Sequence, residues 1–293
     1  MNSQTFSAAL NSSRIIVADG AMGTMLQEAG LPPGAPPEAW LLDNGEAVRK
    51  IHRAYVDAGS NLILTCTFGA TRPRLERSGL ADRLIDINRR AVEVAREAAG
   101  EGVFVAGDIG PMGEFLAPLG DLTYQEAVDI FAEQADALTG AGVDVLYIET
   151  MAALAEVQAA VEGALQVADG TPVTATLSFD SHGRTNMGVR PEDAVEVLLA
   201  LGVDALGANC GATLDMTLGA VEAMHAVSPD TPLIVKPNAG KPRLVEDEVV
   251  YDATPEDMAD YARRFVALGA RVVGGCCGST PEHIAVIARA VGR

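Results

Sequence analysis

Positive charge is scarce in this sequence. Its 21 lysines and arginines stand against 40 aspartates and glutamates, a formal net charge of −19. A surface of that sign repels nucleic acids and anionic membranes, so we expect neither as a partner. The sequence also lacks a run of about 18 uninterrupted apolar residues, so it predicts no membrane-spanning helix. Its first residues show no basic segment followed by an apolar one, as a secretory signal would. These absences favour a cytoplasmic protein.

Cysteine is equally scarce, with only Cys66, Cys210, Cys276 and Cys277 in 293 residues. So few cysteines do not make a disulfide scaffold, and in a reducing compartment such residues more often bind metals or act in catalysis. Cys276 and Cys277 are adjacent, which disfavours a disulfide between them, because bridged cysteines need well-separated Cα atoms and converging Cβ vectors. Two neighbouring thiols surrounded by glycines are typical of a site for a soft metal, most often zinc.

Short apolar, β-branched runs alternate with longer helical patterns along the chain. Eight such runs are predicted as strands, several buried on both faces: 14–20, 61–68, 103–110, 144–150, 172–179, 204–210, 232–238 and 271–277. Helices are predicted over 46–58, 80–99, 124–141, 152–168, 191–201, 214–226 and 254–268, with a last helix starting near Thr280. The proline-rich stretch 31–40 and the stretch 238–254 are predicted as loops.

Eight strand–helix units in a chain of this length predict an α/β fold, a single (β/α)₈ TIM barrel forming one domain over residues 1–293. The main alternative is an open, doubly wound sheet. That fold would carry a GxGxxG turn after the first strand, and the turn at 19–24 does not match it.

Side chains at the carboxyl ends of barrel strands converge on the active site. Three of the four cysteines fall at such ends, Cys210 in the sixth run and Cys276 with Cys277 in the eighth. The alternative for Cys210 is a small buried apolar residue. Cys66 precedes the end of the second run, so by alternation it faces the other way and is predicted in the core.

Three thiolates leave one tetrahedral position of zinc open, which is typical of a catalytic rather than a structural site. The negative charge of such a centre makes it poor at activating water. It suits a thiol substrate, which zinc holds deprotonated near neutral pH. We therefore predict zinc (Zn²⁺) as the cofactor, Cys210, Cys276 and Cys277 as its catalytic ligands, and alkylation of a thiol as the reaction.

A thiol amino acid also needs partners for its charged groups. Glu149, at the end of a very apolar run, is the candidate for the ammonium, although an ion pair with a neighbouring strand is the alternative. The backbone at Asp19 and Gly20 could bind the carboxylate, or Asp19 could cap the following helix. Asn238 ends the seventh run and joins the substrate-binding candidates. Lys236 points into the barrel by alternation, so a lysine-dependent lyase is the alternative function.

Six motifs resemble the homocysteine S-methyltransferase family: DGAMGT (19–24), TCTFGAT (65–71), IET (148–150), GANCG (207–211), KPNAGKP (236–242) and GGCCGSTPEHI (274–284). They span nearly the whole chain in the family's order. The resemblance implies a (β/α)₈ barrel with zinc on Cys210, Cys276 and Cys277. It implies homocysteine as methyl acceptor and methionine as product. It also implies that the carboxylate of homocysteine lies near the backbone of Asp19 and Gly20, and its amine near Glu149.

The methyl donor is less well defined. PNAG and TFGAT resemble the homocysteine-binding module of cobalamin-dependent methionine synthase and bacterial stand-alone proteins similar to betaine–homocysteine methyltransferase. Animal betaine enzymes have aromatic residues where this chain has Gly69 and Thr150, and an aromatic cage holds a quaternary ammonium best. The expected donor is a small onium compound such as betaine, or a methyl-corrinoid carried by a separate protein. A non-catalytic subunit that presents homocysteine or zinc to a partner is a further alternative.

Overall fold

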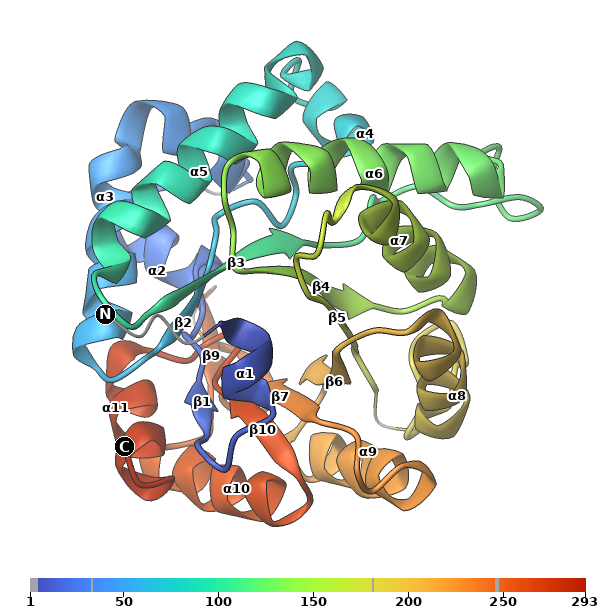
Figure 1. The fold of residues 1–293 in the computed structure, drawn as a ribbon. Coiled ribbons are helices and arrows are strands. Elements are labelled where there is room, and N and C mark those ends of the chain that lie inside the picture. The colour runs from blue at the N-terminus through green and yellow to red at the C-terminus, as the bar shows by residue number, and fades with distance from the viewer. Residues whose placement is uncertain (1–4, 33, 181, 246–247) are drawn as a thin grey trace.

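The structure is a computed structural model that describes residues 5–32, 34–180, 182–245 and 248–293. Its main sheet has eight strands in the order β1-β10-β7-β6-β5-β4-β3-β2, all paired in parallel. A parallel bridge between Ala18 and Leu62 joins the edge strands β1 (Ile16–Val17) and β2 (Leu62–Leu64), which closes the sheet. The predicted (β/α)₈ barrel is therefore confirmed, with helices surrounding the strands (Figure 1).

Each remaining strand overlaps one of the predicted runs: β3 (Phe104–Ile109), β4 (Val145–Met151), β5 (Val173–Leu177), β6 (Ala205–Cys210), β7 (Leu233–Pro237) and β10 (Ala270–Val273). The last of these is shorter than predicted. It ends before Gly274, and Cys276 and Cys277 follow in a loop beyond the strand. In this loop Gly275 packs closely against Ser279, where a Cβ would lie 2.3 Å from the Ser279 hydroxyl oxygen.

The outer helices are α3 (Pro37–Asp57), α5 (Leu84–Ala99), α6 (Tyr124–Gly140), α7 (Leu154–Val167), α8 (Pro191–Leu201), α9 (Leu214–Val227), α10 (Pro255–Ala267) and α11 (Pro281–Ala290). A 3₁₀ turn, Ala81–Arg83, precedes α5. Capping boxes at Thr123, Thr254 and Thr280 satisfy free N–H groups where α6, α10 and α11 begin. Among the described residues, no helix is long and apolar enough to cross a bilayer.

Two predicted loops contain regular structure. The stretch 31–40 is a loop only in its first part, because Pro37 occupies the first position of α3, where its fixed φ favours a helix. The stretch 238–254 contains an antiparallel pair, β8 (Pro242–Val245) and β9 (Glu248–Tyr251). Both corrections matter for function, because Glu38 of α3 and Tyr251 of β9 lie at the site described below.

The described residues also form three short helices, α1 (Phe6–Leu10), α2 (Gly23–Glu28) and α4 (Arg72–Glu76). Helix α1 lies across one end of the barrel (Figure 1), where the Phe6 ring packs edge-on against Phe104 at 5.5 Å between centroids. Residues of α1 belong to the same apolar cluster as inward-facing residues of the strands. Helix α1 therefore plugs the barrel at the end where β3 begins.

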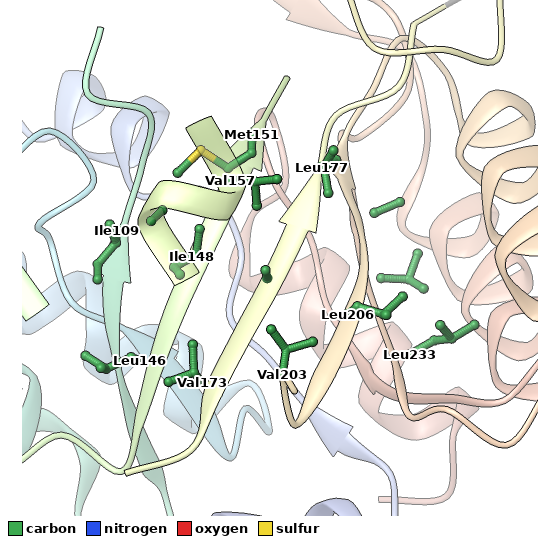
Figure 2. Close-up of a cluster of buried hydrophobic side chains, with 14 of the residues drawn as sticks. Ile109, Leu146, Ile148, Met151, Val157, Val173, Leu177, Val203, Leu206 and Leu233 are labelled. Atoms are coloured by element: carbon green, nitrogen blue, oxygen red, sulfur yellow. The ribbon is translucent and has the colours of Figure 1, made fainter. Parts of the chain in front are cut away.

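The main core lies between the strands and the outer helices. Figure 2 shows Leu146 and Ile148 of β4 in this layer with Val157 of α7. Because strand residues alternate between faces, the residues between and beyond them, Tyr147 and Glu149, belong to the barrel interior. This alternation explains how a nearly all-apolar strand delivers one carboxyl group to the site.

Candidate active site

Three cysteine sulfurs meet at the carboxyl end of the barrel. The Sγ atom of Cys210, the last residue of β6, lies 3.6 Å from that of Cys276 and 4.0 Å from that of Cys277. All three sulfurs lie within 4.8 Å of one another, a spacing that can hold one metal ion. Cys66 does not join this group. It is 4% exposed within the main apolar core, as predicted, but it also lines the cavity described below and does not face fully away from the site.

Backbone contacts between three loops position these sulfurs. The Cys276 N–H donates to the Pro237 carbonyl (2.8 Å), and the Ala239 N–H donates to the Cys277 carbonyl (2.9 Å). Asn238 contacts the Cys210 sulfur through its Oδ1 at 3.2 Å and donates from Nδ2 to the Gly211 carbonyl (2.8 Å). The predicted residue Asn238 thus lies beside the thiols and fixes the turn after β6.

Left-handed backbone conformations and a glycine make room around the thiols. Cys210 itself has φ +58°, an uncommon value for a residue with a side chain. Gly278 has φ +76°, and a Cβ there would lie 2.1 Å from Cγ of Tyr251. The Tyr251 side chain, half-buried over this glycine, hydrogen-bonds to Cys277. The prediction missed Tyr251 because it lies in a stretch interpreted as a loop.

The thiols share protons through hydrogen bonds. Hydrogen bonds with Cys210 and Cys276 lower the pKa of the Cys277 thiol to about 3, and hydrogen bonds with the other two thiols raise the pKa of Cys210. One sulfur therefore ionises easily while its neighbours keep their protons. A soft divalent cation would replace those protons and offset most of the negative charge of the three thiolates, so the donor set fits zinc.

A buried ion pair crosses the barrel below the thiols. Asp19 accepts a hydrogen bond from the Lys236 ammonium (3.0 Å) with one oxygen and from the Leu64 N–H (2.8 Å) with the other. The alternative that Asp19 caps the next helix is wrong, because α2 begins at Gly23 without a side-chain cap. Burial alone would lower the pKa of Lys236, but Asp19 and Glu149 together raise it. Lys236 points into the barrel as predicted and is held as a cation.

Two buried carboxyl groups face the same space. Burial raises the pKa of Glu149 to about 8, and burial followed by the nearby Glu149 raises the pKa of Asp108 well above its ordinary value. Asp108 Oδ1 lacks a hydrogen-bond partner among the described residues. No ion pair to Glu149 occurs in the described part of the chain, so its predicted alternative role is not observed. The site has a deficit of positive charge that an ammonium would relieve.

Asn209 positions Glu149. Its Nδ2 donates to Glu149 Oε2 (3.3 Å) and to Thr150 Oγ1 (2.7 Å), and its Oδ1 accepts from the Thr150 N–H (2.8 Å). These bonds hold Thr150 at φ +62°, which is strained for a β-branched residue. No role was predicted from the sequence for Asn209, which precedes Cys210, or for Asp108, although Asp108 lies near the end of β3.

Gly20 lies where a side chain could not. A Cβ there would be 2.7 Å from the Ser279 hydroxyl oxygen and 2.8 Å from the Tyr55 ring. The next N–H group, of Ala21, already donates to Ser279 Oγ (3.1 Å). The predicted contact with the carboxylate of a substrate therefore falls to the backbone around Gly20 itself.

One cavity of about 600 Å³ connects these groups, within the usual size range of ligand pockets. Its lining includes Asp19, Gly20, Asp108, Glu149, Lys236 and the three cysteines, together with Glu38, Phe68, Gly69 and Arg74. Asn238 is not part of this lining, but it contacts the sulfur of Cys210, which is. The structure therefore brings together Asp19, Gly20, Glu149 and the three predicted metal ligands, and places Asn238 behind them.

Comparison with known proteins agrees with this geometry. The sequence model of the family described as homocysteine S-methyltransferase matches residues 16–291. Methionine synthase of Mycobacterium leprae is 33% identical over 299 residues, which cover 96% of this chain and 24% of that protein. Betaine–homocysteine S-methyltransferase 1 of Mus musculus is 32% identical over 302 residues, covering 95% of this chain and 72% of that protein. This chain thus spans about a quarter of the mycobacterial protein.

Solved structures give the same result. The metallated form of the homocysteine methyltransferase MmuM from Escherichia coli superposes with a TM-score of 0.77 at 30% identity, covering 96% of this chain and 98% of that one. Its oxidised form gives a TM-score of 0.75, also at 30% identity, over 94% and 96% of the two chains. This chain and the E. coli protein therefore match in sequence and in structure over nearly the full length of both.

Proposed function

This chain belongs to the homocysteine S-methyltransferase family, and we propose on that basis that it methylates the sulfur of homocysteine to form methionine at zinc held by Cys210, Cys276 and Cys277. The observation that carries the proposal is the meeting of three thiols with two unpaired buried carboxyl groups in one cavity. The E. coli homologue is described in a metallated form, which supports a metal here.

Zinc bound by these three sulfurs would lower the pKa of the homocysteine thiol and keep its sulfur nucleophilic. The protein supplies the positioning. Asn238 holds the Cys210 turn, Tyr251 hydrogen-bonds to Cys277, and Gly278 leaves room for the ring. These contacts place the thiols before any substrate enters, so little reorganisation is needed during the reaction.

The carboxyl groups would bind the ammonium of homocysteine. Glu149 and Asp108 are buried, and in the described part of the chain neither forms an ion pair, because the nearby Lys236 is paired with Asp19. An ammonium between them would favour their ionised forms and would gain charge-assisted hydrogen bonds. The carboxylate of homocysteine is assigned to the backbone at Gly20, with the Lys236 charge nearby. Binding both groups orients the sulfur toward the cysteines.

The lyase alternative finds little support in this geometry. A Schiff-base lysine must be neutral to attack a carbonyl, and its pKa is usually depressed for that purpose. Lys236 has the opposite environment, because Asp19 and Glu149 raise its pKa. Turnover distinguishes the proposed activity from a non-catalytic role, in which the chain only presents homocysteine to a partner.

The test combines metal analysis with methionine formation. Zinc-loaded protein is given homocysteine and, in turn, betaine, dimethylsulfoniopropionate, S-methylmethionine and methylcobalamin. We expect one zinc per chain and methionine with at least one donor. Cys276→Ser should lose both, whereas Cys66→Ala, a change at a buried cysteine that lines the cavity but lies outside the thiol group, should keep its zinc. Stoichiometric zinc in the Cys276→Ser protein would refute the ligand assignment, and no methionine with any donor would favour the non-catalytic role.

A further inference from the structure

The cavity carries a further carboxylate that the proposed binding of homocysteine does not use. Glu38 is the second residue of α3 and lines the same cavity as the three cysteines. It is 5% exposed. One of its oxygens accepts a hydrogen bond from the Gly69 N–H at 2.6 Å, which fixes the carboxylate against the turn after β2.

This carboxylate has no cation bound to it. In the described part of the chain no ion pair to Glu38 is found, and the nearby Arg74 donates instead to the Pro111 carbonyl (3.2 Å) and stacks over Phe68 at 5.5 Å. Burial raises the pKa of Glu38, while hydrogen bonds from backbone N–H groups and the charge of Arg74 oppose the rise. A cationic ligand in the cavity would therefore be attracted to it.

Gly69 makes this arrangement possible. A Cβ at position 69 would lie 2.8 Å from Glu38 Oε1 and 3.1 Å from Arg74 Nε, so a side chain there would displace both groups. Among the described residues that line the cavity, Phe68 is the only aromatic one. A cage of several aromatic rings, which binds quaternary ammonium groups elsewhere, is therefore not formed by these residues, and because Arg74 already stacks over Phe68, the Glu38 carboxylate is the group left to attract a cation.

We propose that Glu38 is the residue that selects the methyl donor, and that the donor is a small onium compound whose positive charge lies against this carboxylate. The assignment rests on the proposed function, since it places the second reactant of that reaction. The thiolate sulfur of homocysteine donates its electron pair to the methyl carbon. The bond from that carbon to the onium sulfur or nitrogen breaks, and its electron pair stays on the leaving sulfide or amine. The products are methionine and a neutral group, and nothing is oxidised or reduced.

The loss of charge on the donor also gives Glu38 a role in turnover. Before transfer the carboxylate contacts a cation, and after transfer it contacts a neutral sulfide or amine. The electrostatic attraction that held the donor disappears with the reaction, so the product binds more weakly than the substrate and leaves. A methyl-corrinoid donor carries no such onium charge and would gain nothing from Glu38.

The test is Glu38→Gln in the zinc-loaded, full-length protein. Glutamine keeps an oxygen to accept the Gly69 N–H and removes only the charge. The matched control is Glu156→Gln. Glu156 is also buried, at 9% exposure, also accepts one backbone hydrogen bond (from Met112, 3.0 Å) and also feels Arg74, but it does not line this cavity. KM and kcat are measured with S-methylmethionine, dimethylsulfoniopropionate and betaine, and with methylcobalamin as the donor without an onium group.

We expect Glu38→Gln to raise the KM of the onium donor at least about tenfold, with the KM of homocysteine, the zinc content and any methylcobalamin-dependent rate within about twofold of wild type. Glu156→Gln should change none of them. An unchanged onium KM, or an equal loss with onium and methylcobalamin, would overturn the proposal. If methylcobalamin were the only donor that supports turnover, the proposal would be overturned and the proposed function would stand. If none of the tested donors supported turnover, both would be overturned.

Discussion

Replacing Glu149 with glutamine should weaken homocysteine binding and stabilise the protein at the same time. The side chain lies at the end of β4, is 8% exposed and accepts one hydrogen bond from Asn209. Glutamine keeps that acceptor and the shape of the side chain. What it removes is a negative charge that burial disfavours and that the ammonium of homocysteine is proposed to neutralise.

The two effects have calculable signs. A charge-assisted hydrogen bond contributes about 1.5–3 kcal/mol, so its loss should raise the KM of homocysteine roughly 10- to 150-fold. The pKa of Glu149 rises from 4.5 to about 8 on folding, mainly through burial. Ionised Glu149 therefore lowers stability progressively as pH rises from the unfolded toward the folded pKa, and the penalty is constant above about 8. Glutamine has no such penalty, so the gain in melting temperature should grow over that window.

The assay measures the KM of homocysteine at saturating donor, and the melting temperature of the substrate-free protein across this pH range. Glu156→Gln is the control, because burial raises the pKa of that carboxyl as well, yet it lies outside the site. It should leave the KM of homocysteine unchanged. A Glu149→Gln protein with normal KM, or with a lower melting temperature than wild type at alkaline pH, would refute the assignment of Glu149 as the ammonium partner.

Three further predictions concern the same cavity. As the pH rises toward 8, the affinity for methionine should increase by up to about tenfold per pH unit, because binding of its ammonium requires ionised Glu149, whose pKa is about 8. Methionine is used because its sulfur carries no titratable proton. Calorimetry that shows the same affinity across this pH range would contradict the prediction. Lys236→Met removes the partner at 3.0 Å from buried Asp19, and should lower the free energy of unfolding by about 3–5 kcal/mol, whereas a loss below about 1 kcal/mol in denaturant titrations would indicate that Asp19 finds another partner. Gly278→Ala places a methyl group at φ +76° against Tyr251. We therefore expect weaker zinc binding in a chelator competition assay. Wild-type zinc affinity would show that the loop at Gly278 can accommodate the methyl group without disturbing the thiols.

The barrel and the thiol site were predictable because both follow from local patterns. Strand β4 is buried on both faces and mostly apolar, which is typical of a parallel sheet enclosed by helices. In a closed parallel barrel every strand end reaches the same face, so cysteines distant in sequence, such as Cys210 and Cys276, must converge once the strands are assigned. No knowledge of the neighbouring strands is needed for that step.

The partners of Asp19 could not be predicted in this way. Asp19 contacts Leu64 through barrel closure and Lys236 across the interior. From sequence alone, an aspartate before a helix is equally well explained as a cap. The same holds for Asn209, whose contact with Glu149 depends on how β4 and β6 lie within the barrel. Glu38 reaches the cavity because α3 begins at Pro37, within the proline-rich stretch that was predicted to be a loop.

Zinc K-edge X-ray absorption of the zinc-loaded protein, with and without homocysteine, tests the central claim most directly. The account predicts three sulfur neighbours at about 2.3 Å from zinc in the free protein, supplied by Cys210, Cys276 and Cys277, and four after homocysteine is added. Fewer than three sulfurs in the free protein, or a sulfur count that does not change with homocysteine, would contradict it.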